Sequence, residues 1–279
     1  MTLSDGLIHS PGSPALIGTG DVGSVAYDGP QRRWLPVPLE WVLPGGAQYA
    51  YTLPNGFGPS TGVHLVDVAS GRDELVPGSG KIGGSEAIYE MNSATADGIY
   101  LQGAGPAGPL QGLWLLDLRT GRITFKARVG WSNVQVGGGA AWWGGAENED
   151  PGFAAPGTLY RVALTPGAAT KAWFTRRGLR LNMLGFDASG QPLVEAYSSQ
   201  VVELWRITGQ NAGIRLASST GTQDVPARYY SGVVSDSNGT WIGGSFGVFL
   251  LQPGSSLIQL SPMALRVAGP CSGSGSTLR

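Results

Sequence analysis

A short pattern recurs along most of the chain at a nearly constant spacing, and this repeat constrains the fold more than any other feature. Each copy has a glycine or a small polar residue, then four or five mostly apolar residues, then a turn. The five clearest copies are GVHLVDVASG from Gly62, GLWLLDLRTG from Gly112, TLYRVALTPG from Thr158, ELWRITGQNAG from Glu203 and GVFLLQPGS from Gly247. Their first residues lie 50, 46, 45 and 44 positions apart, a period typical of β-propeller blades.

Strand-like segments surround each copy, so that four short strands recur in every repeat. No segment has the period and length of an amphipathic helix. A weaker sixth copy, GSVAYDG, begins at Gly23. Six copies of four strands predict an all-β, six-bladed propeller with antiparallel strands in each blade.

The first blade lacks its opening strand, and we expect ALRVAGP at 264–270 to supply it. Closing one blade from both chain ends leaves no free sheet edge. The sequence therefore predicts a single propeller domain over residues 1–271 and a flexible tail over 272–279.

Composition agrees with many short strands joined by tight turns, because the 46 glycines accompany 42% hydrophobic residues. A net charge of −1 provides no field that would attract nucleic acid. The only cysteine, Cys271, excludes an intrachain disulfide, and no apolar run is long enough to span a membrane. We expect a bacterial protein that is extracellular or at the cell surface, with a leader or anchor in a longer precursor.

Two stretches resemble known propeller repeats. DSNGTWIGGSFGVFLL, residues 236–251, is similar to the repeat of two-component-regulator propellers. LEWVLPGGAQYAYTL, followed by GVHLVDVASG, resembles the WD40-like repeat of TolB-type propellers. These resemblances imply the fold and no catalytic residue, because the matching positions build blades and propellers host many functions.

Two motifs in the sequence match catalytic or nucleotide-binding patterns by letters alone. The G-x-S-x-G around Ser245 is the nucleophile elbow of serine hydrolases, which requires a helix after the serine and a histidine later in the chain. Strand-like residues follow Ser245 and both histidines, His9 and His64, precede it, so we predict a turn. GAGPAG at 103–108 matches a dinucleotide-binding motif, but Pro106 within it, Pro109 directly after it and the strand that follows favour a loop.

Three further polar features have an ordinary interpretation and a functional one. The acidic loop at 146–152 has oxygen ligands for calcium, although its spacing favours a solvated loop. His64 alternates within a strand, which favours a packed or surface residue over a metal ligand. The sequon at Asn238 falls in a predicted turn, where Asn-Gly accommodates positive φ.

Candidate binding residues follow from the expected position of the channel mouth. The residues near the start of each innermost strand are Glu40, Glu86, Asn133, Asn182, Tyr230 and Arg266. Trp131 joins them because it lies beside a strand-opening loop and is less easily explained by the packing between blades that accounts for most of the tryptophans. These side chains suit a small polar ligand, and Glu86, Asn133 and Asn182 suit a metal such as calcium; a solvated channel lining is the alternative.

Three long connections, at 54–61, 103–111 and 144–156, join second to third strands in consecutive blades. Long loops in compact domains are often functional, although neutral insertion explains them equally well. We therefore weigh two functions. The first is an extracytoplasmic recognition or sensor module that binds a protein, peptide, glycan or small ligand on its long-loop face. The second is a metal-dependent hydrolase or lyase at the channel mouth, and the absence of a catalytic histidine favours the first.

Overall fold

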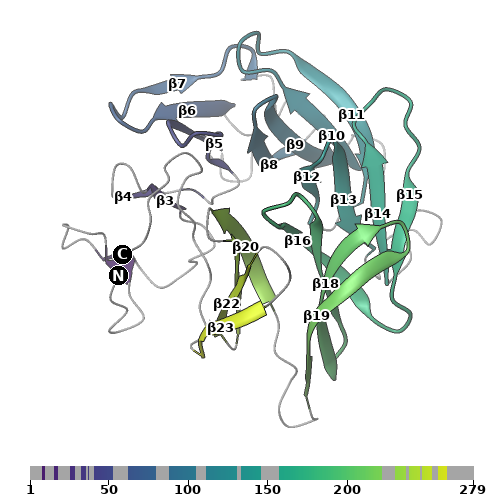
Figure 1. The fold of residues 1–279 in the computed structure, drawn as a ribbon. Helices are drawn as coiled ribbons and strands as arrows, with labels where there is room; N and C mark the ends of the chain where they lie inside the picture. The colour runs from purple at the N-terminus through teal and green to yellow at the C-terminus, as the bar shows by residue number, and fades with distance from the viewer. Residues whose placement is uncertain are drawn as a thin grey trace.

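The computed structural model describes most of the chain between residues 41 and 262. The described ranges are 41–52, 62–79, 88–104, 111–130, 133–145, 157–221, 230–236, 239–245, 247–252 and 257–262, with 8–9, 16–17, 26–28, 33–35 and 37 before them. Within these ranges the chain forms β-strands joined by tight turns, and its sheets stand around a common centre (Figure 1). No helix in the described ranges has the length and apolar character that a membrane crossing requires.

Four sheets have the predicted four antiparallel strands in sequence order. Blade 2 has β8 (Ile88–Thr95), β9 (Gly98–Ala104), β10 (Gln111–Leu116) and β11 (Ile123–Val129). Blade 3 has β12 (Gln135–Gly137), β13 (Ala140–Gly144), β14 (Thr158–Ala163) and β15 (Lys171–Thr175). Blade 4 has β16 (Arg180–Phe186), β17 (Pro192–Tyr197), β18 (Val201–Gly209) and β19 (Ala212–Thr220). Blade 5 has β20 (Tyr230–Asp236), β21 (Gly239–Gly244), β22 (Gly247–Leu251) and β23 (Leu257–Ser261).

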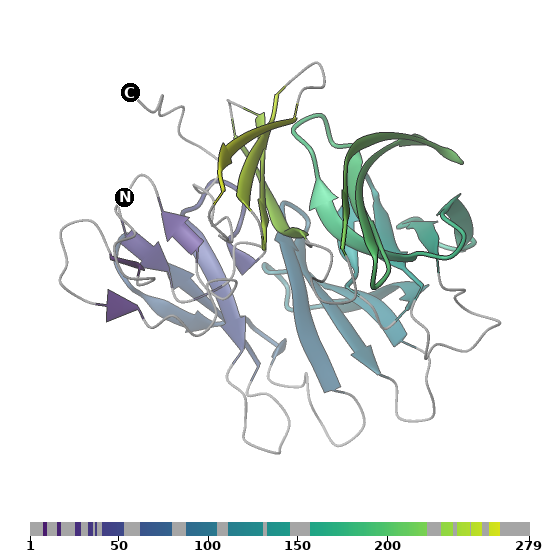
Figure 2. The ribbon, with the colours of Figure 1, turned by 90° about the horizontal axis from the view of Figure 1, so that it is seen from below.

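Blade 1 is built from β5 (Gln48–Thr52), β6 (Val63–Asp67) and β7 (Asp73–Leu75). Beside β5, Val42 forms a bridge with Tyr49, and the Leu43 amide donates to the Gln48 carbonyl. These residues mark the innermost position of the blade. The first strand of every blade lies nearest the centre and the last lies at the periphery, which is the arrangement of a β-propeller (Figure 1). Figure 2 shows the twist of the sheets, most clearly in the green strands of blade 4.

The prediction of six blades is wrong, because the described residues form five. The expected sixth blade needed residues near 14–37 in one sheet, but β1 (Ile8–His9) pairs with β2 (Leu16–Ile17) while β3 (Ala26–Asp28) pairs with β4 (Arg33–Leu35). No ladder joins these two pairs within the described residues. The predicted closing strand at 264–270 lies outside the described residues.

Apolar side chains fill the spaces between neighbouring blades. One cluster joins blade 1 to blade 2 and includes Val63, Ile99 and Leu101. Equivalent clusters join blade 2 to 3, blade 3 to 4 and blade 4 to 5. On the other side of blade 1, Leu35 and Val37 pack with Val42 and Val68. The core is therefore divided into layers, each shared by two adjacent sheets.

Candidate functional site

Three of the predicted channel-mouth residues are described, and all three lie where blades 3, 4 and 5 meet. Asn133 precedes β12 and donates from Nδ2 to the Met183 carbonyl of β16 at 3.2 Å. Its Oδ1 accepts from Gln135 Nε2 at 3.0 Å, so both polar atoms of the amide are engaged. Asn182, the neighbour of Met183, hydrogen bonds through its side chain to Glu195 of β17. The Tyr230 amide, at the start of β20, donates to Glu195 Oε1 at 2.7 Å.

Glu195 connects two of these residues and was not predicted from the sequence. Its side chain is only 4% exposed. Burial raises the pKa of this carboxyl, and the hydrogen bonds from Tyr230 and Asn182 oppose that change. The strand PLVEAY reads as a buried core strand, and the single acid within it is the signal that would have identified this site.

The three described side chains differ in what they offer a ligand. Asn133 is exposed and Asn182 is half-buried. The Tyr230 ring lies in the core between blades 4 and 5, where it meets the Phe249 ring edge to face with the ring centroids 5.9 Å apart. Burial, followed by the charge of Glu195, raises the pKa of the Tyr230 phenol. Glu40, Glu86, Trp131 and Arg266 lie outside the described residues.

Side chains from the inner strands of one blade repeatedly bond to the backbone of the next. From blade 2, Asn92 Nδ2 donates to the Val134 carbonyl at 2.8 Å, and Gln102 Nε2 donates to the Gly130 carbonyl at 2.9 Å. Asn133, just before β12, also donates from blade 3 to blade 4. These bonds satisfy carbonyls in the connection between blades 2 and 3 and in the first strand of blade 4, so these polar residues orient one blade against its neighbour.

The prediction that Ser245 lies in a turn is confirmed. β21 ends at Gly244, the turn contains Ser245, and β22 begins at Gly247. The two strands pair up to Gly243 and Val248. A strand follows the serine where a nucleophile elbow has a helix, so the local structure is a hairpin.

His64 lies in a polar cluster on one face of blade 1, as a packed strand residue. Its Nδ1 is 2.9 Å from Asp73 Oδ1, and its ring stacks on Tyr51 with centroids 4.9 Å apart. The Tyr51 hydroxyl donates to the other oxygen of Asp73. This hydrogen bond raises the pKa of Tyr51 to about 12 and lowers that of Asp73. No group of three or more His, Cys, Asp or Glu side chains in the described ranges is arranged to hold a metal.

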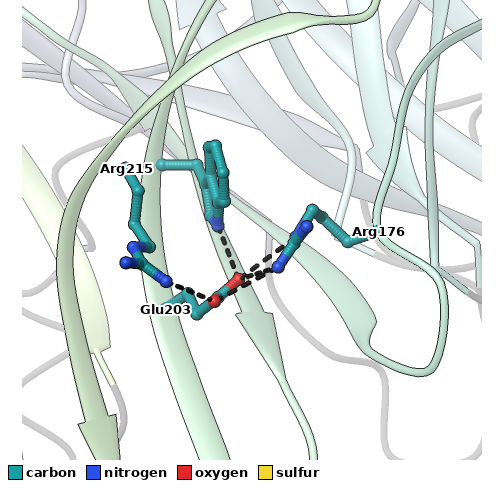
Figure 3. A network of polar contacts seen from close by, with 4 residues as sticks. Arg176, Glu203 and Arg215 are labelled. Carbon is teal, nitrogen blue, oxygen red and sulfur yellow. Dashed lines mark hydrogen bonds and ion pairs between the residues drawn. The ribbon is translucent and has the colours of Figure 1, made fainter.

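A second buried carboxylate, Glu203 of β18, lies where blade 3 meets blade 4 (Figure 3). Arg176 donates to both of its oxygens at 2.9 to 3.2 Å, Arg215 donates at 3.2 Å and the Trp205 indole at 2.9 Å. Burial alone would raise the pKa of Glu203, but these hydrogen bonds outweigh burial and lower it. The Arg176 guanidinium also lies 4.8 Å from the Trp205 ring centroid. These contacts fasten the end of blade 3 to blade 4.

The connections expected to form a binding wall attach to equivalent points in blades 1, 2 and 3. They join β5 to β6, β9 to β10 and β13 to β14. Because the sheets share one strand order, these attachment points lie on the same face of the propeller, here called the long-loop face. Residues 53–61, 105–110 and 146–156, with the acidic loop at 146–152, lie outside the described residues. In blades 4 and 5 the corresponding connections span only 198–200 and 245–246.

The five blades and their shared apolar layers define a β-propeller, which confirms the predicted architecture apart from the number of blades. No protein-family model and no curated protein matches the chain, so neither repeat family that it resembles is supported by a family model.

Solved structures with related folds come from peptidases and a TolB protein. One, from a study of two prolyl endopeptidases and their inter-domain dynamics, has a TM-score of 0.53 at 12% identity, covering 78% of this chain and 35% of its own. Prolyl oligopeptidase B from Galerina marginata has a TM-score of 0.50 at 13% identity, covering 78% and 32%. TolB from Acinetobacter baumannii has a TM-score of 0.47 at 12% identity, covering 79% and 54%. The chain thus spans about a third of each prolyl peptidase, and the first two likenesses concern the fold alone.

Proposed function

We propose that the chain is an extracytoplasmic recognition or sensor module that binds a protein, peptide or glycan across its long-loop face. The observation that carries the proposal is the common attachment of three long connections in three consecutive blades. Connections on a rigid scaffold are the usual carriers of binding residues, and blades 1 to 3 form a continuous scaffold through their shared apolar layers.

The contacts of Asn133 and of Glu195 also support binding over catalysis. Asn133 and Glu195 are engaged in hydrogen bonds that join blades, so they position backbone instead of pointing free groups at a substrate. In this proposal the channel mouth sets the relative orientation of the blades. The long connections then supply the contacts that select the ligand.

The proposal is tested with a variant in which residues 105–110 are replaced by Asn-Gly. Ala104 and Gln111 face each other in the ladder, so a two-residue turn can join them without changing the register. A control variant shortens the turn at 165–168 on the opposite face, where the Ala168 amide donates to the Thr165 carbonyl.

Wild type and both variants are screened on an immobilised glycan array and against a phage-displayed peptide library. We expect wild type and the control to select the same ligands, and the 105–110 variant to lose them at an unchanged melting temperature. A wild type that selects no ligand, or a 105–110 variant that keeps them all, contradicts the proposal. Stoichiometric calcium or zinc in elemental analysis would instead favour the metal-dependent hydrolase or lyase.

A further inference from the structure

A guanidinium rests against two tryptophans on blade 3. Arg161 of β14 pairs with Trp142 of β13, and its guanidinium carbon lies 5.3 Å from the centroid of that ring. The same carbon lies 4.8 Å from the centroid of Trp173 in β15. The two indoles meet edge to face at 83°, with centroids 5.6 Å apart, so the guanidinium lies in the corner between them. The rings restrict the arginine side chain, while its N–H donors stay available at the edge of the planar group.

The positive charge at this corner has no anionic partner in the described part of the chain. Arg161 is half-buried, and within the described residues its guanidinium interacts with the two tryptophan rings. Lys171, which is exposed, lies directly opposite Arg161 in the ladder. Two like charges directly opposite each other on neighbouring strands are unfavourable. An anion between them would remove this repulsion.

At the equivalent position of blade 4, an arginine is paired with a carboxylate. Counted from the bulge in each blade, Arg206 occupies the position of Arg161. Arg206 Nε lies 3.0 Å from Asp187 Oδ2, and both side chains are largely buried. The strand position that Asp187 holds in blade 4 is occupied in blade 3 by Gly137, which has no side chain. Blade 3 therefore has the arginine of this pair without its carboxylate.

The surroundings of the cluster are held in place by blade 4. The Asn211 amide, in the turn between β18 and β19, donates to the Trp173 carbonyl at 2.7 Å. Trp142 is buried in the apolar layer between blades 3 and 4, and Trp173 packs against that layer. An arginine fixed in this way loses little side-chain entropy when it binds a planar anion.

From this geometry we infer that Arg161, with Lys171 beside it, binds a carboxylate carried on an apolar or aromatic body. The guanidinium fork matches a carboxylate in two parallel hydrogen bonds, and the partly exposed Trp173 ring offers an apolar surface beside it. The site lies toward the hairpin ends opposite the long-loop face, so it is independent of the proposed function.

The test is isothermal titration of the full chain at low salt with benzoate, acetate and inorganic phosphate. Benzoate is expected to bind at one saturable site, more tightly than acetate or phosphate. Arg161→Gln should weaken benzoate binding by about tenfold, because a charge-assisted bidentate contact is lost. Lys171→Gln, an exposed change that leaves the core intact, should weaken it by roughly threefold. The matched control is Lys126→Gln, on the outer strand of blade 2, which should change nothing.

A fourth variant, Gly138→Asp, places a carboxylate in the turn between β12 and β13, next to Gly137, which holds the strand position of Asp187. Gly138 has a φ of +58° and open space where a side chain would point, and aspartate tolerates this conformation. At Gly137 a Cβ would come within 2.4 Å of the Phe186 ring, so that position is avoided. Gly138→Asp is expected to weaken benzoate binding.

Three results would overturn the inference: no saturable benzoate binding by wild type, tighter binding of phosphate, or folded Lys171→Gln and Gly138→Asp variants that bind benzoate as wild type does. The variant shortened at 105–110 should keep its benzoate site. Failure of this inference is therefore distinguishable from failure of the proposed function.

Discussion

Glu195 and Gln102 occupy the same position in the second strand of their blades, and each makes a hydrogen bond there with a different side-chain group. Counted from the bulges of blades 2 and 4, they occupy equivalent places, and each bonds to backbone outside its own sheet: Gln102 to Gly130 in the connection after β11, and Glu195 to Tyr230 at the start of β20. Gln102 donates to a carbonyl, whereas Glu195 accepts from an amide. An uncharged glutamine could also accept that hydrogen bond through its amide oxygen. We therefore expect the connection between blades not to require the buried charge of Glu195.

We predict that Glu195→Gln changes the free energy of unfolding by less than about 1 kcal/mol at neutral pH, because it keeps the acceptor and removes a buried charge. Glu195→Ala should cost about 2–3 kcal/mol, because the Tyr230 amide loses its partner. Urea unfolding measures both.

Since the pKa of Glu195 is raised in the folded state, wild type should lose stability relative to Glu195→Gln as the pH rises above the ordinary carboxyl range. A difference in unfolding free energy between wild type and Glu195→Gln that does not change with pH would contradict a raised pKa for Glu195.

The cluster of Tyr51, His64 and Asp73 has its own dependence on pH. The pKa of Tyr51 is raised to about 12, chiefly by its hydrogen bond to Asp73. This bond should stabilise the fold up to the ordinary pKa of tyrosine and be lost as the pH rises toward 12. We predict that Asp73→Asn returns the Tyr51 titration, followed by NMR of labelled tyrosine, toward its ordinary value of 10.0. Glu74→Gln, on the same strand, is the control and should leave the titration unchanged.

Sequence reasoning singled out some residues of these hydrogen-bond networks and missed others for a physical reason. Asn133 and Asn182 were predicted at the channel mouth because strand starts can be located from the repeat. Glu195 was missed because its partners are the Tyr230 backbone and a side chain on another strand, and neither leaves a local motif. The contacts of His64 were missed for the same reason, since Asp73 lies across a strand pair that the register alone defines.

At the scale of elements, the close approach of blades 3 and 4 depends on a missing side chain. A Cβ on Gly144 would lie 1.7 Å from the Leu181 carbonyl oxygen, which belongs to the innermost strand of the next blade. Backbone groups cannot yield as a flexible side chain can. The glycine is therefore a requirement of sheet packing and not only of the adjoining turn.

We predict that Gly144→Ala lowers the free energy of unfolding by about 3 kcal/mol, since it must push two blades apart. Gly209→Ala is the matched control. Its nearest neighbour would be the Ala212 Cβ at 3.7 Å, an ordinary contact. The control should stay within about 1 kcal/mol of wild type. Equal melting temperatures for the two variants would show that the blades are not packed as described.

Strands were easier to predict than the sheets they form. The four strands per repeat are confirmed in blades 2 to 5, because apolar segments and turn residues are local properties of the chain. The number of blades was wrong, because the repeat near Gly23 indicates strands without saying which edges pair. β1 pairs with β2, and the spacing of strands in the sequence does not determine which strands pair.

At the scale of the whole molecule, the segment before blade 1 contributes to the fold although it adds no blade. Leu35 and Val37 are each 2% exposed and pack with Val42 and Val68. We predict that a chain of residues 38–279 is less stable than wild type by about 3–5 kcal/mol, the value of burying two such side chains. Thermal unfolding followed by circular dichroism measures the loss. A chain of residues 26–279, which retains β3 and β4, should melt at a higher temperature than the shorter chain.

The bonds that join each blade to the next are not alike. Asn92, Gln102 and Asn133 donate to carbonyls, while Glu195 accepts from an amide, so the bond between blades 4 and 5 has the opposite polarity to the other three. Moving a blade to another position in the propeller would place two hydrogen-bond donors opposite each other, or would leave a backbone carbonyl without a donor. The blades share one architecture but are not interchangeable parts. A chain in which blade 4 is exchanged with another blade should therefore be less stable than wild type unless Glu195 is changed with it.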